Sequence, residues 1–300
     1  MLYNKDASKV IPVGDKSVHV FEAESKNLDP ITVASFGEEW SKFDSFNEDE
    51  ISRVGDEYFD VVDFSSINKE NTVALDVGCG TGRWSIYLSD KVKEVYAVDP
   101  SKAVLAAAKL TEKNKNIHLS QASTDSLPFN DNTFDFVFSL GVLHHIPDTA
   151  SALNDIVKKL KPGGTCLIYL YYALDNRSFL YKFIFKCSHV FRLLICRMPS
   201  FLKKLTCDLI AILIYLPFIT LSKIMKVIAG EKIAAKVPLS YYRNKSFNIV
   251  RNDALDRFGT PLEQRFSKKE ITKMMEDAGL KDLLFSDNTP YWHVTGKKTQ

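Results

Sequence analysis

Three glycines at alternate positions follow a short apolar run and an acid. The segment reads Val73-Ala74-Leu75-Asp76-Val77-Gly78-Cys79-Gly80-Thr81-Gly82-Arg83, and a helix-compatible run begins at Trp84. Glycine lacks a Cβ atom, so its backbone reaches conformations closed to other residues and lets ligand atoms approach closely. A strand, a glycine turn and a helix in this order predict a site for a nucleoside-bearing cofactor. A tight turn with no ligand is the alternative.

The spacing of the glycines narrows the class of cofactor. A dinucleotide-binding turn requires Gly-x-Gly-x-x-Gly. Here the third glycine, Gly82, comes one residue early, and Arg83 follows it where that glycine should stand. Neither Gly-Lys-Ser nor Gly-Lys-Thr follows the turn, so the sequence excludes a P-loop.

A second acid stands at the distance expected for a ribose contact. The run Glu94–Val98 resembles a buried strand, and it ends in Asp99, 21 residues after Gly78. In doubly wound folds an acid about 20 residues after the first glycine hydrogen-bonds the ribose hydroxyls. Pro100 then starts a helix, so Asp99 could equally cap that helix. The two roles are compatible, and the spacing favours the ribose.

Two further strands are followed by polar residues. Ile117–Ser120 reads as a short strand, and Leu127-Pro128-Phe129 and a polar turn follow it. Thr133–Ser139 reads as the next strand, and it leads into Leu140–Asp148, which contains two adjacent histidines. The carboxyl ends of parallel strands form the ligand-binding edge of such a sheet. We therefore expect the histidines near the cofactor.

From about residue 70 to residue 171, the order and the amino-acid sequences of these segments resemble those of class I S-adenosylmethionine (SAM) methyltransferases. The Leu-His-His-Ile-Pro segment at 143–147 is similar to that of the ubiquinone/menaquinone-type branch. In that family an Asp-Ala pair usually contacts the adenine, and Ser123 and Thr124 stand at the matching positions. The resemblance implies SAM as cofactor, methyl transfer as activity, and the following cofactor contacts: Asp76, Gly78, Cys79, Gly80, Gly82, Arg83, Asp99, Pro100, Ser123, Thr124, Asp125, Ser139 and Leu140.

The end of the chain agrees with this fold. Lys268–Ala278 has helical spacing, and Leu280–Phe285 and Tyr291–Gly296 form two candidate strands. The predicted class is α/β, a doubly wound, mostly parallel, seven-stranded sheet that ends in an antiparallel hairpin. We expect a helical or lid segment at 1–60, a SAM-binding core at 61–175, a basic apolar helical insertion at 176–236, and a segment at 237–300 with an acceptor loop, the last helix and the hairpin.

The net charge of +2 conceals an uneven distribution. Between Arg177 and Lys226 there are nine basic residues and one acid, Asp208, a net charge of +8. Lys182, Lys186, His189, Arg192 and Arg197 fall in one arc of a helical wheel, which predicts a basic amphipathic helix.

The insertion has three interpretations. One is a helical lid that packs on the core or on a second subunit, which is compatible with a homodimer. The second is docking on an anionic membrane surface through residues 177–226. The third, nucleic-acid binding, is disfavoured because long aliphatic runs separate the basic residues. A membrane span is rejected, because Leu209–Leu221 supplies 13 uncharged residues and a span needs about 20.

The acceptor side of the reaction is less defined. His145, His144 and Tyr242 are the candidate catalytic residues, with one histidine as a general base. A histidine that packs against the cofactor or the core is the commoner case. The polar loop from Tyr241 to Arg265 is a candidate acceptor site, since the equivalent segment lines that site in related methyltransferases. Many relatives with an N-terminal Phe-Gly-x-x-Trp element, which stands at 36–40 here, act on glycan, lipid or other small acceptors. The expected acceptor is small or lipid-linked, of the cell-envelope saccharide or quinone-precursor type.

Composition sets the remaining expectations. The five cysteines have no metal-ligand spacing, so no metal is expected, and Met1–Asp6 contains no apolar signal segment. We therefore expect a cytoplasmic protein, with a peripheral position at the inner membrane face if the insertion docks there. The alternatives are a non-enzymatic SAM-binding scaffold at the membrane surface and, with less support, a nicotinamide-dependent reductase.

Overall fold

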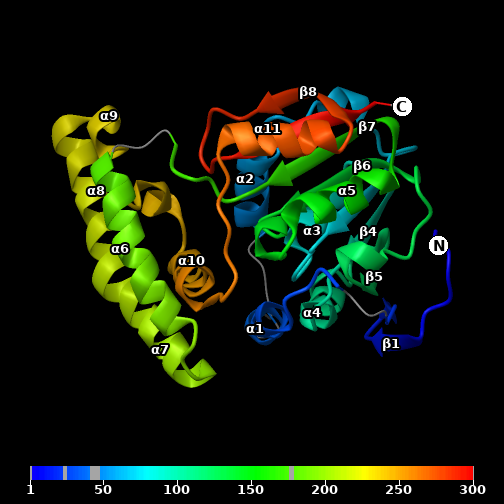
Figure 1. Cartoon of the computed structure of the whole chain (residues 1–300), viewed down its shortest axis with the longest axis horizontal. Helices are drawn as coiled ribbons and strands as arrows, with labels where there is room; N and C mark the ends of the chain where they lie inside the picture. The colour runs from blue at the N-terminus through cyan, green and yellow to red at the C-terminus, as the bar shows by residue number, and fades with distance from the viewer. Residues whose placement is uncertain (1, 23–25, 41–47, 176–178, 300) are drawn as a thin grey trace. The chain divides into compact units, whose positions relative to one another are not determined.

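The computed structural model describes residues 2–22, 26–40, 48–175 and 179–299. The chain divides into two compact units (Figure 1): unit 1 comprises Met1–Asp175 and Leu262–Gln300, and unit 2 comprises Asn176–Pro261. Unit 2 therefore includes residues 237–261 as well as the predicted insertion at 176–236. Arg177, which contributes to the predicted basic charge, lies outside the described residues.

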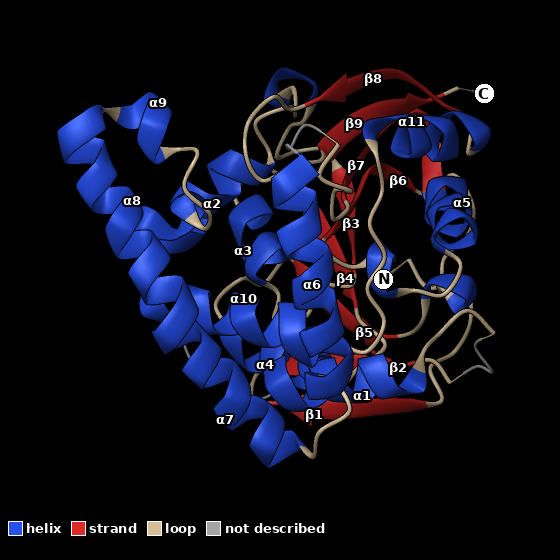
Figure 2. Cartoon of the chain, turned by 60° about the vertical axis from the view of Figure 1, so that its left-hand side comes forward, coloured by secondary structure: helices blue, strands red, loops and turns tan. Residues whose placement is uncertain are grey.

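Unit 1 is built on one mixed sheet, shown in red in Figure 2. Its order is β1-β2-β5-β4-β3-β6-β7-β9-β8. The described part of the sheet has nine strands rather than the predicted seven; the bounds are Lys9–Val13 (β1), Lys16–Val20 (β2), Val73–Val77 (β3), Glu94–Val98 (β4), Ile117–Gln121 (β5), Phe134–Leu140 (β6), Leu160–Tyr169 (β7), Leu280–Phe285 (β8) and His293–Lys298 (β9). The strands β3 to β7 pair in parallel, and β9 is antiparallel to both its neighbours, as expected.

The two additional strands form an N-terminal hairpin. β1 and β2 are antiparallel, and β2 pairs with β5 in parallel. The buried Lys16 fixes the hairpin, because its Nζ donates to the carbonyl oxygens of Asn114 at 2.6 Å and Ile117 at 2.8 Å. The sequence predicted a helical or lid segment at 1–60, whereas residues 9–13 and 16–20 of it form strands. The described residues after the hairpin do form two helices, α1 (Pro30–Trp40) and α2 (Glu48–Tyr58).

Helices cover both faces of the sheet. Alternate residues of a strand point to opposite faces, so Leu75 and Val77 belong to one apolar cluster, whereas Ala74 belongs to the other. Helices α5 (Thr149–Lys159) and α11 (Lys268–Asp277) contribute to the first cluster. Helices α2, α3 (Arg83–Ser89) and α4 (Ala103–Leu110) contribute to the second. Unit 1 is thus a three-layer, doubly wound α/β fold.

The strand order reverses at β3. Strands β4 and β5 lie on one side of β3, and β6 and β7 lie on the other. In open α/β sheets, ligands bind outside the carboxyl ends of the strands at this reversal point. The glycine turn follows β3, Asp99 follows β4, and the two histidines follow β6. The topology therefore brings the predicted residues to one edge of the sheet.

Unit 2 is helical in its described residues. It contains α6 (Phe179–Ile195), α7 (Ser200–Ile210), a π turn η4 (Ala211–Tyr215), α8 (Leu216–Ala229), α9 (Glu231–Ala234), the 3₁₀ turn η5 (Ser240–Asn244) and α10 (Phe247–Gly259). Helix α10 packs against both α6 and α7 (Figure 2). Val250, Ala254 and Phe258 of α10 form a buried cluster with Tyr215 and Ile219.

The structure changes two expectations about the insertion. Segments α7, η4 and α8 form one continuous helix, Ser200–Ala229, of 30 residues, which we call the long helix. It is long and apolar enough to cross a membrane by length and composition alone, so the sequence argument that 13 residues are too few does not hold. Arg192 is not on the exposed face of α6: it is 5% exposed, and its Nη1 donates to the carbonyl oxygens of Thr260 at 2.7 Å and Pro261 at 3.1 Å.

Candidate cofactor site

The glycine turn depends on left-handed backbone conformations. The φ angles of Gly78, Gly80 and Gly82 are +78°, +54° and +82°. A non-glycine residue would be strained at each of these positions. A Cβ atom on Gly78 would also lie 2.4 Å from a methyl carbon of Val142, whereas one on Gly80 would meet no atom within 4 Å. The backbone of Gly80 therefore borders open space, as close approach of a ligand requires.

Asp99 holds this turn from the neighbouring strand. Its Oδ2 accepts a hydrogen bond from the Gly80 N–H at 2.9 Å. Its Oδ1 accepts two from Ser101, the N–H at 2.8 Å and the hydroxyl at 2.5 Å. A carboxylate has about four acceptor positions, so one remains for a ribose hydroxyl. These bonds to Ser101 fix the turn before α4, whose N-cap is Lys102, so Asp99 is not the N-cap of that helix, and it keeps the capacity to bind a ligand.

Asp76 is a second buried acid beneath the turn. It is 1% exposed, and its Oδ2 accepts a hydrogen bond from the Ser85 hydroxyl at 2.6 Å. Burial, together with the nearby Asp99 charge, raises the pKa of Asp76 to about 7. Burial also raises the pKa of Asp99. A cationic ligand beside these two buried acids would favour their ionised forms and so lower both pKa values.

Cys79, Arg83 and Pro100, which were also predicted to contact the cofactor, lie at or near the turn and make contacts within the protein. Cys79 is buried, and burial raises the pKa of its thiol well above the ordinary value, so the thiol stays protonated. Arg83 begins α3, and its guanidinium lies over the Trp84 ring at 4.5 Å. The carbonyl oxygen of Pro100 accepts a hydrogen bond from the Gln121 side chain at 3.0 Å.

The residues expected at the adenine have other partners. The Ser123 hydroxyl donates to Asp125 Oδ1 at 2.6 Å. Asp125 Oδ2 accepts from the backbone N–H groups of Lys26 at 2.9 Å and Asn27 at 3.2 Å, so it fixes the segment that leads into α1. Thr124 begins the 3₁₀ turn η2 (Thr124–Ser126) and is buried. Their role at the adenine stays a prediction.

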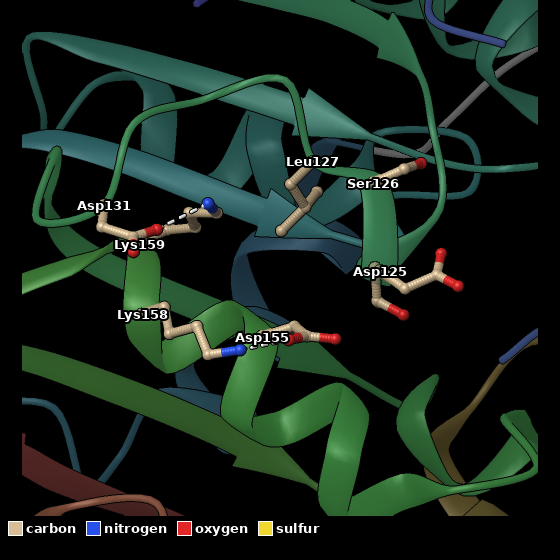
Figure 3. Close-up of a pocket in the computed structure, with 8 residues that line it drawn as sticks. Asp125, Ser126, Leu127, Asp131, Asp155, Lys158 and Lys159 are labelled. Carbon is tan, nitrogen blue, oxygen red and sulfur yellow. Dashed lines mark hydrogen bonds and ion pairs between the residues drawn. The ribbon is translucent and has the colours of Figure 1, made fainter. Parts of the chain in front are cut away.

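A polar cavity of about 270 Å³ lies beside these residues (Figure 3). Two ion pairs form part of its wall, Lys159 with Asp131 at 2.7 Å and Lys158 with Asp155 at 2.8 Å. It is lined by Thr124, Asp125, Ser126, Leu127, Asp131, Asp155, Lys158 and Lys159. Neither the glycine turn nor Asp99 lines it, and cofactor sites are mostly apolar. We therefore place the cofactor site at the turn and not in this cavity.

Ser139 and Leu140 end β6 next to the turn. The Ser139 hydroxyl donates to the carbonyl oxygen of Val77 at 2.8 Å, which ties β6 to β3 where the glycine turn begins. Leu140 is buried. Both residues therefore shape the floor of the predicted site.

The two histidines differ in their surroundings. His144 is 0% exposed and stacks on Tyr171 with ring centroids 3.8 Å apart. Its Nδ1 accepts the Tyr171 N–H at 3.4 Å, and burial lowers its pKa well below the ordinary value, so the ring is neutral. His145 Nδ1 lies 2.6 Å from the carbonyl oxygen of Leu262 and therefore donates to it. This bond leaves His145 Nε2 as the basic nitrogen.

The segment after unit 2 runs beside the histidines. The Gln264 N–H donates to the carbonyl oxygen of His144 at 3.0 Å. The Arg265 guanidinium lies over the Tyr171 ring at 5.0 Å and pairs with Glu263 at 2.8 Å. Part of the predicted acceptor loop, 262–265, is thus next to the histidines. Phe36 of α1 also meets the His145 ring edge-on at 4.9 Å.

Tyr242 belongs to unit 2, and its catalytic role stays a prediction. Its ring packs against Tyr215 and Tyr241, with centroids 5.8 Å and 5.1 Å away. Sequence reasoning missed Ser85, Val142 and Tyr171, which fix Asp76, Gly78 and His144. Only Val142 carried a signal, because it lies between the β6 strand and the histidines.

Comparisons with known proteins agree with this geometry. Residues 75–168 match the family model described as a methyltransferase domain. The match confirms the resemblance noted in the sequence and, with it, SAM as the cofactor that such a domain takes.

Curated relatives match part of the chain. A demethylmenaquinone methyltransferase of Bacillus licheniformis is 39% identical over 99 residues, 32% of this chain and 43% of that protein. The enzyme of the same name from Staphylococcus haemolyticus is 39% identical over 124 residues, 39% of this chain and 52% of that protein. The chain thus spans about half the length of the curated relatives it matches.

A solved structure of a SAM-dependent methyltransferase from Aquifex aeolicus is 17% identical and covers 84% of this chain and 97% of that one, with a TM-score of 0.42. Because this score is low, the fold assignment rests on the strand order.

The open space beside Gly80 leads to a first prediction. We expect Gly80→Ala to lower the free energy of unfolding by about 1–2 kcal/mol, because alanine is strained in the left-handed region. It should also lower SAM affinity at least about tenfold in calorimetry, since its methyl group occupies the space for the ligand. Gly163→Ala is the matched control: Gly163 has φ +77° and also borders open space, but it lies in β7. Equal SAM affinities for the two variants would contradict the assignment.

The remaining acceptor position on Asp99 leads to a second prediction. Asp99→Ala should weaken SAM binding roughly 10-fold to 150-fold, because a hydrogen bond to a charged group contributes about 1.5–3 kcal/mol. Asp63 makes the same pair of bonds to Ser65, N–H at 3.0 Å and hydroxyl at 2.6 Å, away from the site. Asp63→Ala should lose the capping alone and bind SAM normally. A similar loss in both variants would mean that capping, not ribose binding, is what Asp99 contributes.

The raised pKa of Asp76 leads to a third prediction. Between about pH 4 and pH 7 the folded protein keeps a proton that the unfolded chain releases, so stability falls as pH rises, by about 1.4 kcal/mol per pH unit. Asp76→Asn removes this titration and can keep the bond from Ser85. In urea unfolding without SAM, the stability advantage of the variant should grow from about pH 4 to pH 7 and then level off. A difference that does not change with pH would show that Asp76 titrates normally.

Proposed function

We propose that this chain is a SAM-dependent methyltransferase that acts on a small, lipid-soluble acceptor. The observation that carries the proposal is the open backbone at Gly80, held against the Asp99 carboxylate inside a methyltransferase domain. SAM supplies a methyl group that is already activated on a cationic sulfur. The tasks left to the protein are to bind the donor, to orient the acceptor and to manage a proton.

Binding of the donor is assigned to the turn and the two acids. The N–H of Gly80 is already engaged by Asp99, so the turn is preorganised before a ligand arrives. Asp99 would accept a ribose hydroxyl, and the cationic donor would favour the ionised form of Asp76 beneath it. Correct orientation of two reactants can contribute up to about 7–11 kcal/mol to lowering the barrier.

Proton removal from the acceptor is assigned to His145. Its Nδ1 donates to the Leu262 carbonyl oxygen, which fixes the ring and directs basicity to Nε2. His144 is a poorer candidate, because it is fully buried, stacked on Tyr171 and accepts a backbone hydrogen bond through Nδ1. We assign His144 a packing role at the floor of the acceptor side.

The relatives support the choice of acceptor. Both relatives described above are named demethylmenaquinone methyltransferases, which act by name on a quinone precursor. The family model matches residues 75–168, which include the glycine turn, Asp99 and the two histidines, and together with these names it supports an acceptor of the quinone-precursor type. Tyr171 and Phe36 offer aromatic rings beside the histidines, which suits a flat, apolar acceptor.

Methyl transfer from radiolabelled SAM tests the proposal. The purified full chain should transfer label into the organic phase of a bacterial lipid extract, and not into the aqueous phase. His145→Ala should lower this rate by about 10²–10⁴-fold, as expected for loss of a general base, with SAM affinity unchanged. His144→Phe keeps the stacking on Tyr171 and should retain much more of the activity.

The outcomes separate the parts of the proposal. SAM binding without label in any fraction would favour the scaffold alternative. Label in the aqueous phase would exclude a lipid-soluble acceptor. Loss of SAM binding in His145→Ala would mean that this histidine supports the donor site by packing.

A further inference from the structure

The long helix of unit 2 exposes an unusual amount of apolar surface. An 18-residue apolar window within it is only 28% buried. Between Leu209 and Ser222 the sequence contains no charged residue. The exposed large apolar side chains of the helix are Phe201, Leu202, Leu205, Leu209, Ile212, Leu213, Ile214, Leu216, Phe218, Leu221, Ile224, Val227 and Ile228, with exposed fractions from 37% to 87%.

Packing inside unit 2 covers only one line of this helix. The buried positions are Cys207, Ala211, Tyr215, Ile219 and Ser222, spaced by four and then three residues. Residues four apart drift around the axis of an α-helix, because one turn holds 3.6 residues. The π turn at 211–215 has more residues per turn, so the buried positions keep facing α10. The remaining sides are still apolar. A helix that is apolar all round is stable only when apolar surroundings cover it.

The covered line faces the polar side of the unit. Arg251 of α10 makes a two-pronged ion pair with Asp208, both contacts at 2.8 Å. The Tyr215 hydroxyl donates to Asp253 of α10 at 2.8 Å. Polar and charged groups therefore gather where α10 lies, and the opposite sides of the long helix carry apolar groups.

Basic residues flank the apolar surface. Lys203 and Lys204 precede the uncharged stretch, and Lys223 and Lys226 follow it. The single acid between 177 and 226, Asp208, is already paired with Arg251. Helix α6 repeats the pattern: Phe179, Phe183, Val190 and Leu194 are exposed on one face, and Lys182 and Lys186 are exposed at its edge.

We propose that unit 2 docks on an anionic lipid bilayer, with the long helix lying in the plane of the interface. Its apolar sides enter the acyl region by about 5–10 Å, and its lysines meet the lipid phosphates. The inference is independent of the proposed methyl transfer, because it concerns only the surface of unit 2.

A transmembrane orientation conflicts with the packing of α10. If the long helix crossed the bilayer, α10 beside it would carry Arg251, Asp253, Asp256 and Arg257 to membrane depth, where charged side chains are costly. In the plane of the interface, α10 stays on the water side. A second copy of the chain is a poorer occupant, since the lysines along both copies would be brought together.

Sedimentation with vesicles tests the docking. The purified full chain should co-sediment with phosphatidylglycerol-containing vesicles and much less with pure phosphatidylcholine. Leu213→Glu should reduce the bound fraction at least about tenfold. Leu284→Glu is the matched control, because Leu284 is 56% exposed on β8 of unit 1 and Leu213 is 68% exposed. Circular dichroism confirms that both variants are folded.

The lysines have a separate control. Lys203→Gln and Lys204→Gln should each lower the partition coefficient for anionic vesicles roughly fivefold, because each nearby lysine contributes about 1 kcal/mol. Lys281→Gln, on β8 of unit 1, should have no effect. Equal losses for lysines of both units would mean non-specific charge attraction and would overturn the docking surface.

The depth of the long helix in the bilayer distinguishes docking at the interface from a membrane span. Tryptophan placed at Leu213 should be quenched more by lipids brominated near the headgroup than by lipids brominated near the chain ends, after subtraction of the wild-type signal. The reverse order would indicate a span and overturn the proposal. No quenching and no co-sedimentation, with a stable dimer in sedimentation equilibrium, would assign the surface to a second copy and also overturn it.

Discussion

The hydrogen bond from the Gly80 N–H to the Asp99 carboxylate is the constraint on which the donor site depends. It joins the turn after β3 to the end of β4 over 2.9 Å. The carbonyl oxygen of Val98, one residue earlier, accepts from the N–H groups of Gly78 at 2.7 Å and Cys79 at 3.0 Å. A turn with three left-handed residues has little regular structure of its own. The neighbouring strand end supplies its hydrogen bonds, so the parallel pairing of β3 and β4 creates the site.

This arrangement explains why the core of the fold could be predicted from the sequence. The strand, glycine turn, helix and next acid lie within one β–α–β unit, so their contacts depend on local spacing and on the right-handed crossover. Asp99 could therefore be placed beside the turn from its distance along the chain. The same holds for the hairpin at the C-terminus, where helix α11 begins with a capping box between Ser267 and Glu270.

Other residues could not be placed from the sequence, because their positions depend on contacts with residues that are distant along the chain. Arg192 has the helical spacing of a surface cation, yet it is buried because the carbonyl oxygens of Thr260 and Pro261 satisfy it from 68 and 69 residues away. Asp125 is engaged by backbone N–H groups about 100 residues away. The length of the helix Ser200–Ala229 was underestimated because only the uncharged run Leu209–Leu221, with Asp208 at its edge and Pro217 inside it, was counted. Asp208 is neutralised by Arg251, and Pro217 lies where the π turn passes into α8, in the first turn of that helix.

The candidate base is fixed at the point where the chain returns from unit 2. Within unit 2, Arg192 binds the carbonyl oxygens of Thr260 and Pro261. The next residue, Leu262, belongs to unit 1, where its carbonyl oxygen accepts from His145 and its N–H donates to Thr32 of α1 at 3.3 Å. The hydrogen bonds described for the donor turn all come from unit 1. The acceptor side lacks this independence, because the covalent chain passes from the Arg192 contacts to the His145 contact within three residues. Substitutions in unit 2 should therefore affect the acceptor step of the reaction more than they affect SAM binding.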